Sequence, residues 1–246
     1  MELVRIGIIG DFDRGKHSHW ATEAALFHAA ARLGLAVEPR WIATPLLESD
    51  PACLSGCDGI WGAPGSPFAS AQGMLNGIEH ARTRDIPYLG TCAGFQYALI
   101  ELTRNVLGVH DADSAENARD GAQIVITPVQ CAVPVPAGSP ALAGEGVARP
   151  VPGTLLESLC GPEDLRGDFF CSMEANADFV PRWERAGLRI GARGADGEMR
   201  AFELPAKRFF LATLFRPQLA SSYPRPHPII TGFLRAASPS ALRSAP

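Results

Sequence analysis

The sequence lacks any apolar run close to the ~20 residues that a membrane-spanning helix needs. It also lacks an excess of basic residues, since its net charge is -4 and its pI is about 5.9. That balance gives no indication of a surface for nucleic acids or anionic membranes, so we expect neither kind of partner. Because Met1 and Glu2 lead directly into a predicted strand, we expect no signal peptide and a cytoplasmic location.

Cysteine is also sparse, and its spacing excludes two kinds of site. The six cysteines, at positions 53, 57, 92, 131, 160 and 171, are scattered through a chain of 246 residues that is 46% hydrophobic. Such a chain builds its own core, so we expect reduced thiols rather than a disulfide framework. No second Cys or His pair follows Cys53 and Cys57 at ligand spacing, so we predict no metal site. No motif indicates a cofactor.

Apolar runs and helical periodicities alternate along the first half of the chain. Strands are predicted at 3–10, 37–43, 59–63 and 86–89, and helices at 19–33, 73–84 and 95–108. We expect Ser18 to cap the first helix and Gly34 to end it. This alternation predicts an α/β fold of three layers, with a mostly parallel central sheet flanked by helices. Ligands bind at the carboxyl ends of such strands, which places 11–18, 64–70, Cys92 and the loop after Gly108 on one rim.

The second half of the chain has more strand and loop signals. We predict a strand at 123–130, a Pro/Gly-rich loop at 133–153, a hairpin of 188–192 with 199–204, a strand at 209–215 and a helix at 229–237. No internal repeat and no long linker divides the chain. We therefore predict a single domain over 1–237, followed by a disordered Ser/Pro/Ala-rich tail at 238–246.

The strongest functional motif is Gly90-Thr91-Cys92-Ala93-Gly94, which lies where a strand becomes a helix. A tight turn there holds the residue in strained geometry and points its side chain out of the sheet, and flanking glycines avoid clashes. The thiol then lies at a helix N-terminus, whose dipole favours the thiolate. The alternative is a small buried thiol in a glycine-rich turn. The agreement of glycines, strand and helix favours a nucleophile.

Four segments carry a family resemblance. Residues 86–100 resemble I-P-Y-L-G-I-C-L-G-M-Q-x-A-L-I, 111–116 resemble N-A-N-S-T-E, and 186–189 and 227–233 also match. These are motifs of class I glutamine amidotransferases, and in particular of the glutaminase domain of CTP synthase. The resemblance implies a flavodoxin-like topology and a Cys92 that attacks a side-chain amide. The ligase domain that makes CTP has no counterpart here, so we expect no CTP synthesis by this chain alone.

The resemblance also shows a broken catalytic triad. The family takes its base and the carboxylate that orients it from F-H-P-E-F, where this chain reads F-R-P-Q-L at 215–219. Arg216 replaces the histidine, and Gln218 replaces the glutamate. Arginine keeps its proton near pH 7 and cannot be a general base.

Two further segments of the family site are altered. In the oxyanion-hole segment P-G-G-F-G, here 64–68, Gly65 remains and Ser66 replaces a glycine. The segment R-H-R-Y-E-V-N, which binds the glutamine carboxylate through arginine, corresponds to 170–176 and has no arginine. Glu116, whose counterpart holds the amino group, is retained. We therefore expect a site for a small amino compound rather than glutamine, with these further contact residues: Gly65, Ser66, Ala93, Gln96 and Ser172.

Several residues are candidates for the missing base. They are His110 near Glu116, His17 and His19 by the first loop, and Glu174, a carboxylate near a cysteine. For each histidine the alternative is a surface or structural role, and His227 matches a non-catalytic histidine of the family. Arg216 has two alternatives of its own: it stabilises the Cys92 thiolate, or it binds a substrate carboxylate.

Three hypotheses follow. The first is a Cys92-dependent enzyme acting on an amide, ester or related carbonyl other than that of glutamine. The second is an inactive relative that binds a small amino compound or regulates a partner. The third is a residual glutaminase that supplies ammonia to a separate synthase. A face that would meet a synthase is then free for a partner protein or for a homodimer.

Overall fold

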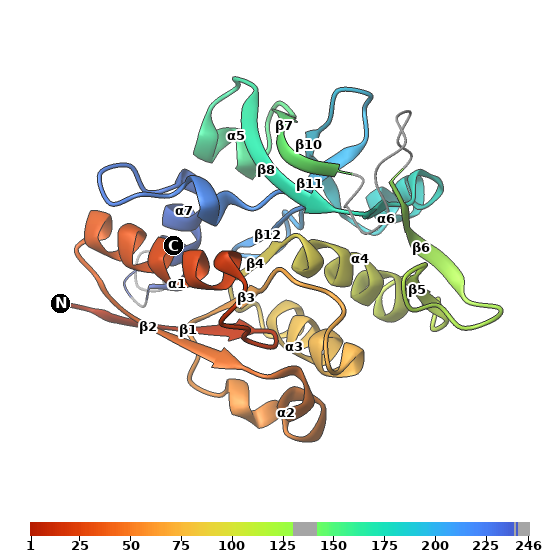
Figure 1. Cartoon of the computed structure of the whole chain (residues 1–246), viewed down its shortest axis with the longest axis horizontal. Helices are drawn as coiled ribbons and strands as arrows, with labels where there is room; N and C mark the ends of the chain where they lie inside the picture. The colour runs from red at the N-terminus through yellow and green to blue at the C-terminus, as the bar shows by residue number, and fades with distance from the viewer. Residues whose placement is uncertain (130–141, 239, 241–246) are drawn as a thin grey trace.

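A nine-stranded sheet forms the centre of the molecule (Figure 1). The computed structural model describes residues 1–129, 142–238 and 240. The strand order of the sheet is β2-β1-β3-β4-β12-β11-β10-β7-β8. Its strands are β1 (Leu3–Ile9), β2 (Ala36–Ile42), β3 (Gly59–Gly62), β4 (Tyr88–Thr91), β7 (Leu142–Pro150), β8 (Leu165–Cys171), β10 (Arg189–Arg193), β11 (Met199–Glu203) and β12 (Phe210–Thr213).

The first five strands in this order are mutually parallel, in the flavodoxin-like arrangement that the resemblance implied. The next four pair antiparallel. Successive reversals leave only β7 and β11 opposed to the other seven strands. The expected α/β fold with a mostly parallel sheet is confirmed. β3, β4 and β12 are buried at every position, as strands covered on both faces must be.

Helices cover both faces of the sheet. A Cβ on Gly59 of β3 would meet Phe233 of α7, whereas one on Gly62 would meet Met74 of α3, so these helices lie on opposite faces. In Figure 1, α1 lies beside α7, and α3 lies beside α4. The α-helices are α1 (His17–Leu33), α2 (Thr44–Ser49), α3 (Ala71–Thr83), α4 (Ala93–Asn105), α5 (Leu155–Cys160), α6 (Val180–Arg185) and α7 (Pro228–Ala237), and the short 3-10 helices are η1 (Pro51–Leu54), η2 (Ala177–Phe179) and η3 (Pro217–Ala220).

Two predictions about the elements were wrong, and one falls largely outside the described residues. Ser18 does not cap α1: the cap position is Lys16, and Ser18 lies buried inside the first turn. Gly34 does end this helix, in the left-handed conformation. The predicted loop at 133–153 contains β7, which pairs with β8 along seven positions, while 133–141 lie outside the described residues. Of the predicted tail, 239 and 241–246 also lie outside them.

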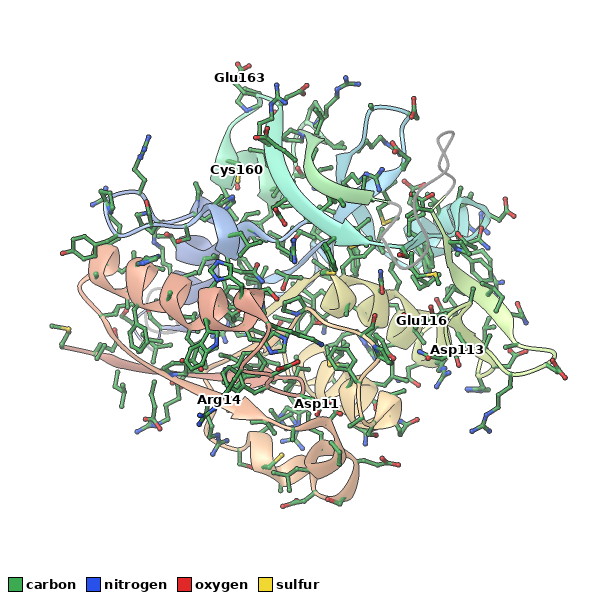
Figure 2. All side chains as sticks on the ribbon, viewed as in Figure 1. Asp11, Arg14, Asp113, Glu116, Cys160 and Glu163 are labelled. Atoms are coloured by element: carbon green, nitrogen blue, oxygen red, sulfur yellow. The ribbon has the colours of Figure 1, made fainter. Side chains whose placement is uncertain are left out.

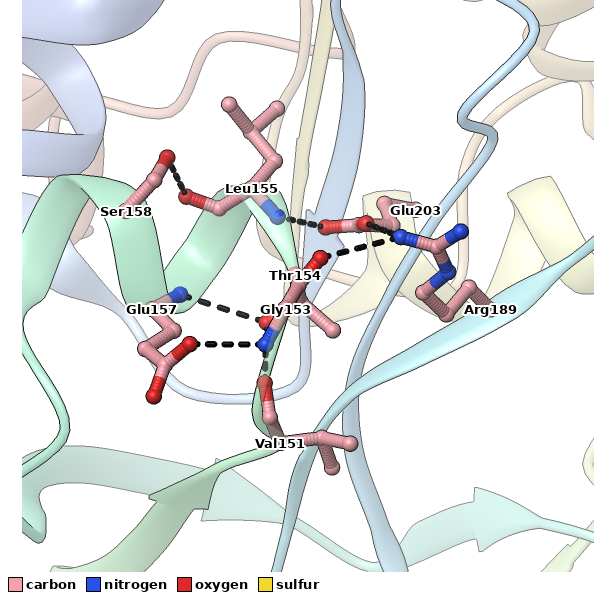
Figure 3. A network of polar contacts seen from close by, with 8 residues as sticks. All are labelled: Val151, Gly153, Thr154, Leu155, Glu157, Ser158, Arg189 and Glu203. Carbon is pink, nitrogen blue, oxygen red and sulfur yellow. Dashed lines mark hydrogen bonds and ion pairs between the residues drawn. The ribbon is translucent and has the colours of Figure 1, made fainter.

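A polar network joins the antiparallel strands to α5 (Figure 3). The buried Glu203 carboxylate of β11 accepts a hydrogen bond of 2.8 Å from the backbone N–H of Leu155 and lies 3.7 Å from Arg189 of β10. Thr154 caps α5 by accepting from the N–H of Glu157. Burial raises the pKa of Glu203. These contacts fix α5 against the sheet, far from the rim described below.

A second, smaller sheet has the order β5-β6-β9. Its strands are β5 (Ala112–Ser114), β6 (Gln123–Pro128) and β9 (Met173–Ala175), so it contains part of the strand predicted at 123–130. The predicted hairpin is confirmed as β10 and β11, which pair antiparallel. None of the helices in the described part of the chain is long and apolar enough to cross a membrane.

Candidate active site

Cys92 occupies a strained turn between β4 and α4. Its φ is 54° and its ψ is -108°, an uncommon conformation for any residue other than glycine. Its N–H donates to the Thr213 carbonyl at the end of β12, 2.9 Å away. A Cβ on Gly94 would lie 2.2 Å from the Gly62 carbonyl oxygen, so only glycine lets α4 approach β3 this closely. The structure therefore has the nucleophile-elbow geometry that the sequence predicted.

Buried side chains hold the elbow in place. The Tyr88 hydroxyl donates to the Gly94 carbonyl at 2.9 Å, and the Trp61 indole N–H donates to the Thr91 hydroxyl at 3.1 Å. Tyr88 and Trp61 are fully buried, so the strain at Cys92 is maintained by surrounding packing rather than by local flexibility.

The surroundings of the Cys92 sulfur lower its pKa. The main cause is a hydrogen bond from the thiol of Cys171, which outweighs the opposing effect of burial. The positive charge of Arg216 and the backbone N–H groups of Ala93 and Gly65 act in the same direction. A thiolate is favoured here without any transfer of its proton to a histidine.

Cys171 was not among the candidate residues. Its Sγ lies 3.3 Å from that of Cys92 and 3.6 Å from the Leu214 carbonyl oxygen, which is the alternative acceptor for its single thiol proton. Its pKa is raised well above the ordinary value, chiefly by its hydrogen bond to Cys92 and by burial. The sequence feature that could have identified Cys171 is its position in the segment 170–176. Because β8 was not predicted, there was no reason from the sequence to place that segment beside Cys92.

Cys92 opens into a cavity of about 640 Å³. Of the predicted contact residues, Gly65, Ser66, Gln96, Glu116 and Ser172 line this cavity, together with Cys92 and Arg216. Ala93 contributes its N–H beside the sulfur. Residues that the sequence did not single out for the site also line it: Lys16, Ser18, Pro64, Asp168, Phe170, Cys171, Met173 and Leu219.

Arg216 directs its hydrogen bonds to β8. Its Nε donates to Asp168 at 2.8 Å, a second nitrogen contacts the same oxygen, and the guanidinium lies over the Phe170 ring, 5.2 Å from its centroid. It acts on Cys92 through its charge and not through a hydrogen bond. The side chain of Phe170, in the segment that resembles the family's carboxylate clamp, is an exposed aromatic.

Three candidate catalytic residues lie elsewhere. His110 is exposed, follows α4 and is not among the residues that line the cavity. The Glu174 carboxylate lies 3.4 Å from Arg200 and does not line the cavity. Gln218 is 2% exposed and donates to the Thr22 hydroxyl of α1 at 3.3 Å, so it orients no group at Cys92.

The other histidines have separate positions. His17 lines the cavity at the start of α1. His19 is buried: its Nδ1 accepts from the Asp13 N–H at 3.0 Å and its Nε2 donates to the Pro64 carbonyl, and burial lowers its pKa. It therefore supports the loop that carries Gly65. His227 caps α7, and burial lowers its pKa to about 4.

Metal ligands do not gather in the described residues, where no group of three or more His, Cys, Asp or Glu side chains could hold an ion.

A family model described as Glutamine amidotransferase class-I matches residues 19–134. The chain is 31% identical over 242 residues to the CTP synthase of Saccharolobus solfataricus and 34% identical over 239 residues to that of Pyrobaculum calidifontis. The two alignments include 96% and 95% of this chain but only 45% of each relative. The chain therefore spans about half the length of these relatives.

Solved structures agree with this similarity. The glutaminase domain of Trypanosoma brucei CTPS with bound acivicin superposes with a TM-score of 0.83 at 27% identity, covering 95% of this chain and 93% of that one. A glutamine amidotransferase of Thermotoga maritima, at 13% identity and a TM-score of 0.56, shares the fold. Its match covers 95% of this chain and 96% of that one.

Proposed function

Because the chain has a class I glutamine amidotransferase domain with the glutaminase domains of CTP synthases among its homologues, we propose that it is a Cys92-dependent enzyme acting on a small carbonyl compound other than glutamine. The observation that carries this proposal is the Cys92 sulfur itself. It lies on a strained elbow, its pKa is lowered, and it opens into a cavity. We take residues 1–237 as one domain that carries out this chemistry.

The neighbouring backbone suits acyl transfer. In the proposed step the Cys92 thiolate attacks a carbonyl carbon, and the N–H groups of Gly65 and Ala93 stabilise the oxyanion that forms. The tetrahedral intermediate then expels its leaving group and becomes a thioester, and water cleaves the thioester to an acid and the free thiol. The cavity supplies the space that both steps need.

The leaving group decides the substrate class. The polar groups that contact Cys92 Sγ in the described residues are Cys171 Sγ, the Phe170 carbonyl and the N–H groups of Ala93 and Gly65, and none of them is a base of near-neutral pKa. An amine must gain a proton as it leaves, which the family assigns to a histidine. An ester or thioester releases a group that leaves more readily without such help. We therefore propose an ester-like carbonyl, with amides turned over slowly.

Glutamine is disfavoured by the cavity walls. A bidentate arginine is the side chain that best matches a free α-carboxylate, yet Arg216, the one arginine among the described residues that line the cavity, directs its Nε and a second nitrogen to Asp168. Phe170 and Met173 line the same region and present apolar surface to the cavity. A carbonyl compound with an apolar group fits this wall better than a zwitterionic amino acid does.

The test is acylation of the reduced chain by p-nitrophenyl acetate, quenched in acid and mapped by mass spectrometry. We expect an acetyl group on Cys92, at least about tenfold above Cys160, a thiol whose pKa burial raises to about 11. Ammonia release from glutamine should equal that of Cys92→Ser. Equal acetylation of Cys92 and Cys160 would contradict the proposal. Ammonia release that disappears in Cys92→Ser would favour a residual glutaminase that feeds a separate synthase.

One observation favours the second hypothesis, a binding or regulatory protein. Glu116 lines the cavity, and its carboxylate can hold the ammonium group of a small amino compound. If this function holds, primary amines raise the melting temperature of the protein, Glu116→Gln removes that shift, and Cys92→Ser leaves it in place. A surface for a partner protein or a second copy belongs to the same hypothesis.

A further inference from the structure

We propose that Cys92 and Cys171 are a redox-active dithiol, which reduces a hydroperoxide and closes to an intramolecular disulfide. This reaction uses the same thiolate as the proposed acyl transfer but needs no carbonyl substrate. The two proposals can therefore fail separately.

The end of β12 brings the two sulfurs together. Two adjacent carbonyls there contact the two cysteines: the Thr213 carbonyl accepts from the Cys92 N–H, and the Leu214 carbonyl oxygen lies 3.6 Å from Cys171 Sγ. The next residues tie β8 to the same place, since the Arg216 N–H donates to the Asp168 carbonyl at 2.8 Å. Cys92 and Cys171 therefore approach each other from the elbow and from β8 onto one short segment.

The resulting separation is suitable for a disulfide. The sulfurs are 3.3 Å apart, and an S–S bond of about 2.05 Å requires an approach of little more than 1 Å. Side-chain rotation of the two cysteines can supply that movement. The other described cysteines, which are Cys53, Cys57 and Cys160, do not line this cavity. Figure 2 shows Cys160 on α5, away from the cavity residue Glu116.

The cavity gives a small oxidant access to the sulfur. Both cysteines are buried, with 8% and 4% of their surfaces exposed, yet both line the cavity. Hydrogen peroxide or a small organic hydroperoxide can enter, whereas a bulky thiol of another protein meets the walls first. The Gly65 and Ala93 N–H groups and the Arg216 charge favour an anion here, including the alkoxide or hydroxide released from a peroxide.

The reaction balances in two steps. The Cys92 thiol first loses its proton to solvent, and its thiolate attacks the hydroxyl oxygen of ROOH. The O–O bond breaks, and RO⁻ takes back one proton from solvent to give ROH, leaving Cys92 as the sulfenic acid. The Cys171 sulfur then attacks the Cys92 sulfur, and the hydroxyl group leaves with the Cys171 proton as water. Two thiols lose two electrons to the peroxide, so the products are one disulfide, one ROH and one water.

The first step prepares the second. In the resting state, the hydrogen bond to the Cys92 thiolate and its negative charge are two of the three causes that raise the Cys171 pKa. Oxidation of Cys92 to a neutral sulfenic acid removes that charge, while the Arg216 charge that favours a Cys171 thiolate remains. Cys171 thus becomes nucleophilic when its target has formed.

Peptide mapping under non-reducing conditions tests the proposal. The full reduced chain is treated with one equivalent of hydrogen peroxide, and free thiols are then blocked. We expect a linked pair of peptides containing Cys92 and Cys171, which dithiothreitol separates. A chain in which Cys92 passes to the sulfinic acid with no link to Cys171, or in which the peroxide links other cysteines instead, overturns the proposal.

Variants separate the two steps. In Cys171→Ser the sulfenic acid cannot be resolved, so dimedone should label Cys92 at least about tenfold more than in the wild type. Cys160→Ser is the matched control and should form the disulfide like the wild type. Equal dimedone labelling with and without Cys171 counts against the proposal. The peptide map is made on the wild-type protein. It therefore tests the proposal even if Cys171→Ser misfolds. Acetylation of Cys92 without a disulfide would reject this inference alone.

Discussion

The two sides of the cavity are built from different parts of the backbone and by different means. One side is the elbow, residues 90–94, in which close backbone contacts fix the position of Cys92. The other side, which we call the β8 wall, consists of residues 168–172 with 214–219, and its chemistry lies in side chains. On the elbow, glycines and main-chain N–H groups position the Cys92 sulfur. On the β8 wall, the groups that act on this sulfur are side chains: the Arg216–Asp168 pair and Cys171.

This difference teaches which properties of the site are tied to the fold. The elbow geometry follows from strand, turn and helix, so any chain that keeps its glycines keeps the strained cysteine. A site of this kind can keep its nucleophile while it changes what activates the nucleophile and what it binds.

The largest effect should come from breaking the elbow. In Gly94→Ala, the new Cβ would lie 2.2 Å from the Gly62 carbonyl oxygen, which belongs to the backbone of a buried strand and has no room to move. We expect the free energy of unfolding to fall by about 3 kcal/mol or more. Urea denaturation followed by circular dichroism measures it.

The matched control is Gly191→Ala in β10. There the nearest atom to the new Cβ is the Cβ of Ala201 at 3.5 Å, an ordinary contact. Its free energy of unfolding should stay within about 1 kcal/mol of the wild type. If both variants unfold alike, close approach at the elbow is not what stabilises this turn.

The difference between the elbow and the β8 wall also explains which parts of the site could be predicted from the sequence. The elbow was predicted because its signals are local: Gly90, Gly94, a preceding apolar strand and a periodic helix lie within one segment. The parallel strands were predicted for the same reason. The β8 wall depends on contacts between residues far apart in sequence, such as Cys92 with Cys171 and Arg216 with Asp168.

Particular errors show the physical limit. His110 lies six residues before Glu116, which lines the cavity, yet His110 itself does not line it. Glu174 is two residues from Ser172, which lines the cavity, yet its carboxylate pairs with Arg200 outside it. Neither the course of a loop nor the pairing of a charge can be judged from proximity along the chain.

A smaller effect should follow from changing the charge on the β8 wall. Arg216 lowers the Cys92 pKa, so Arg216→Gln should raise it. The thiolate fraction near pH 7 then falls, and alkylation of Cys92 by iodoacetamide should slow by roughly threefold to tenfold. The rate should recover as the pH rises through the new pKa, so the two proteins should converge toward the alkaline end of the titration. Alkylation rates measured by mass spectrometry from pH 5 to 10 test this.

Two further variants locate the cause of that change. Arg182→Gln removes another guanidinium that lies over an aromatic ring, 5.0 Å from the centroid of Phe179, but outside the cavity. It should leave the Cys92 profile unchanged. The double variant Arg216→Gln/Asp168→Asn also removes the unpaired carboxylate and should shift the profile less than Arg216→Gln does. A profile unaffected by Arg216→Gln would mean that the wall does not act on the nucleophile through charge.

The smallest effect is expected at Gln218, although the sequence resemblance predicts that it stands at the position of the family's triad carboxylate. Its side chain is buried toward α1, with one hydrogen bond of 3.3 Å to Thr22, and its Oε1 has no hydrogen-bond partner within the described structure. Gln218→Met removes one weak bond together with an unsatisfied acceptor, so stability should change by less than about 1 kcal/mol. The Cys92 alkylation profile should not change. Gln218→Glu, of similar size, buries a carboxylate in the same place and should destabilise the protein more. A shift of the Cys92 profile in Gln218→Met would show that this residue still acts on the nucleophile, and the division between elbow and wall would then have to include η3.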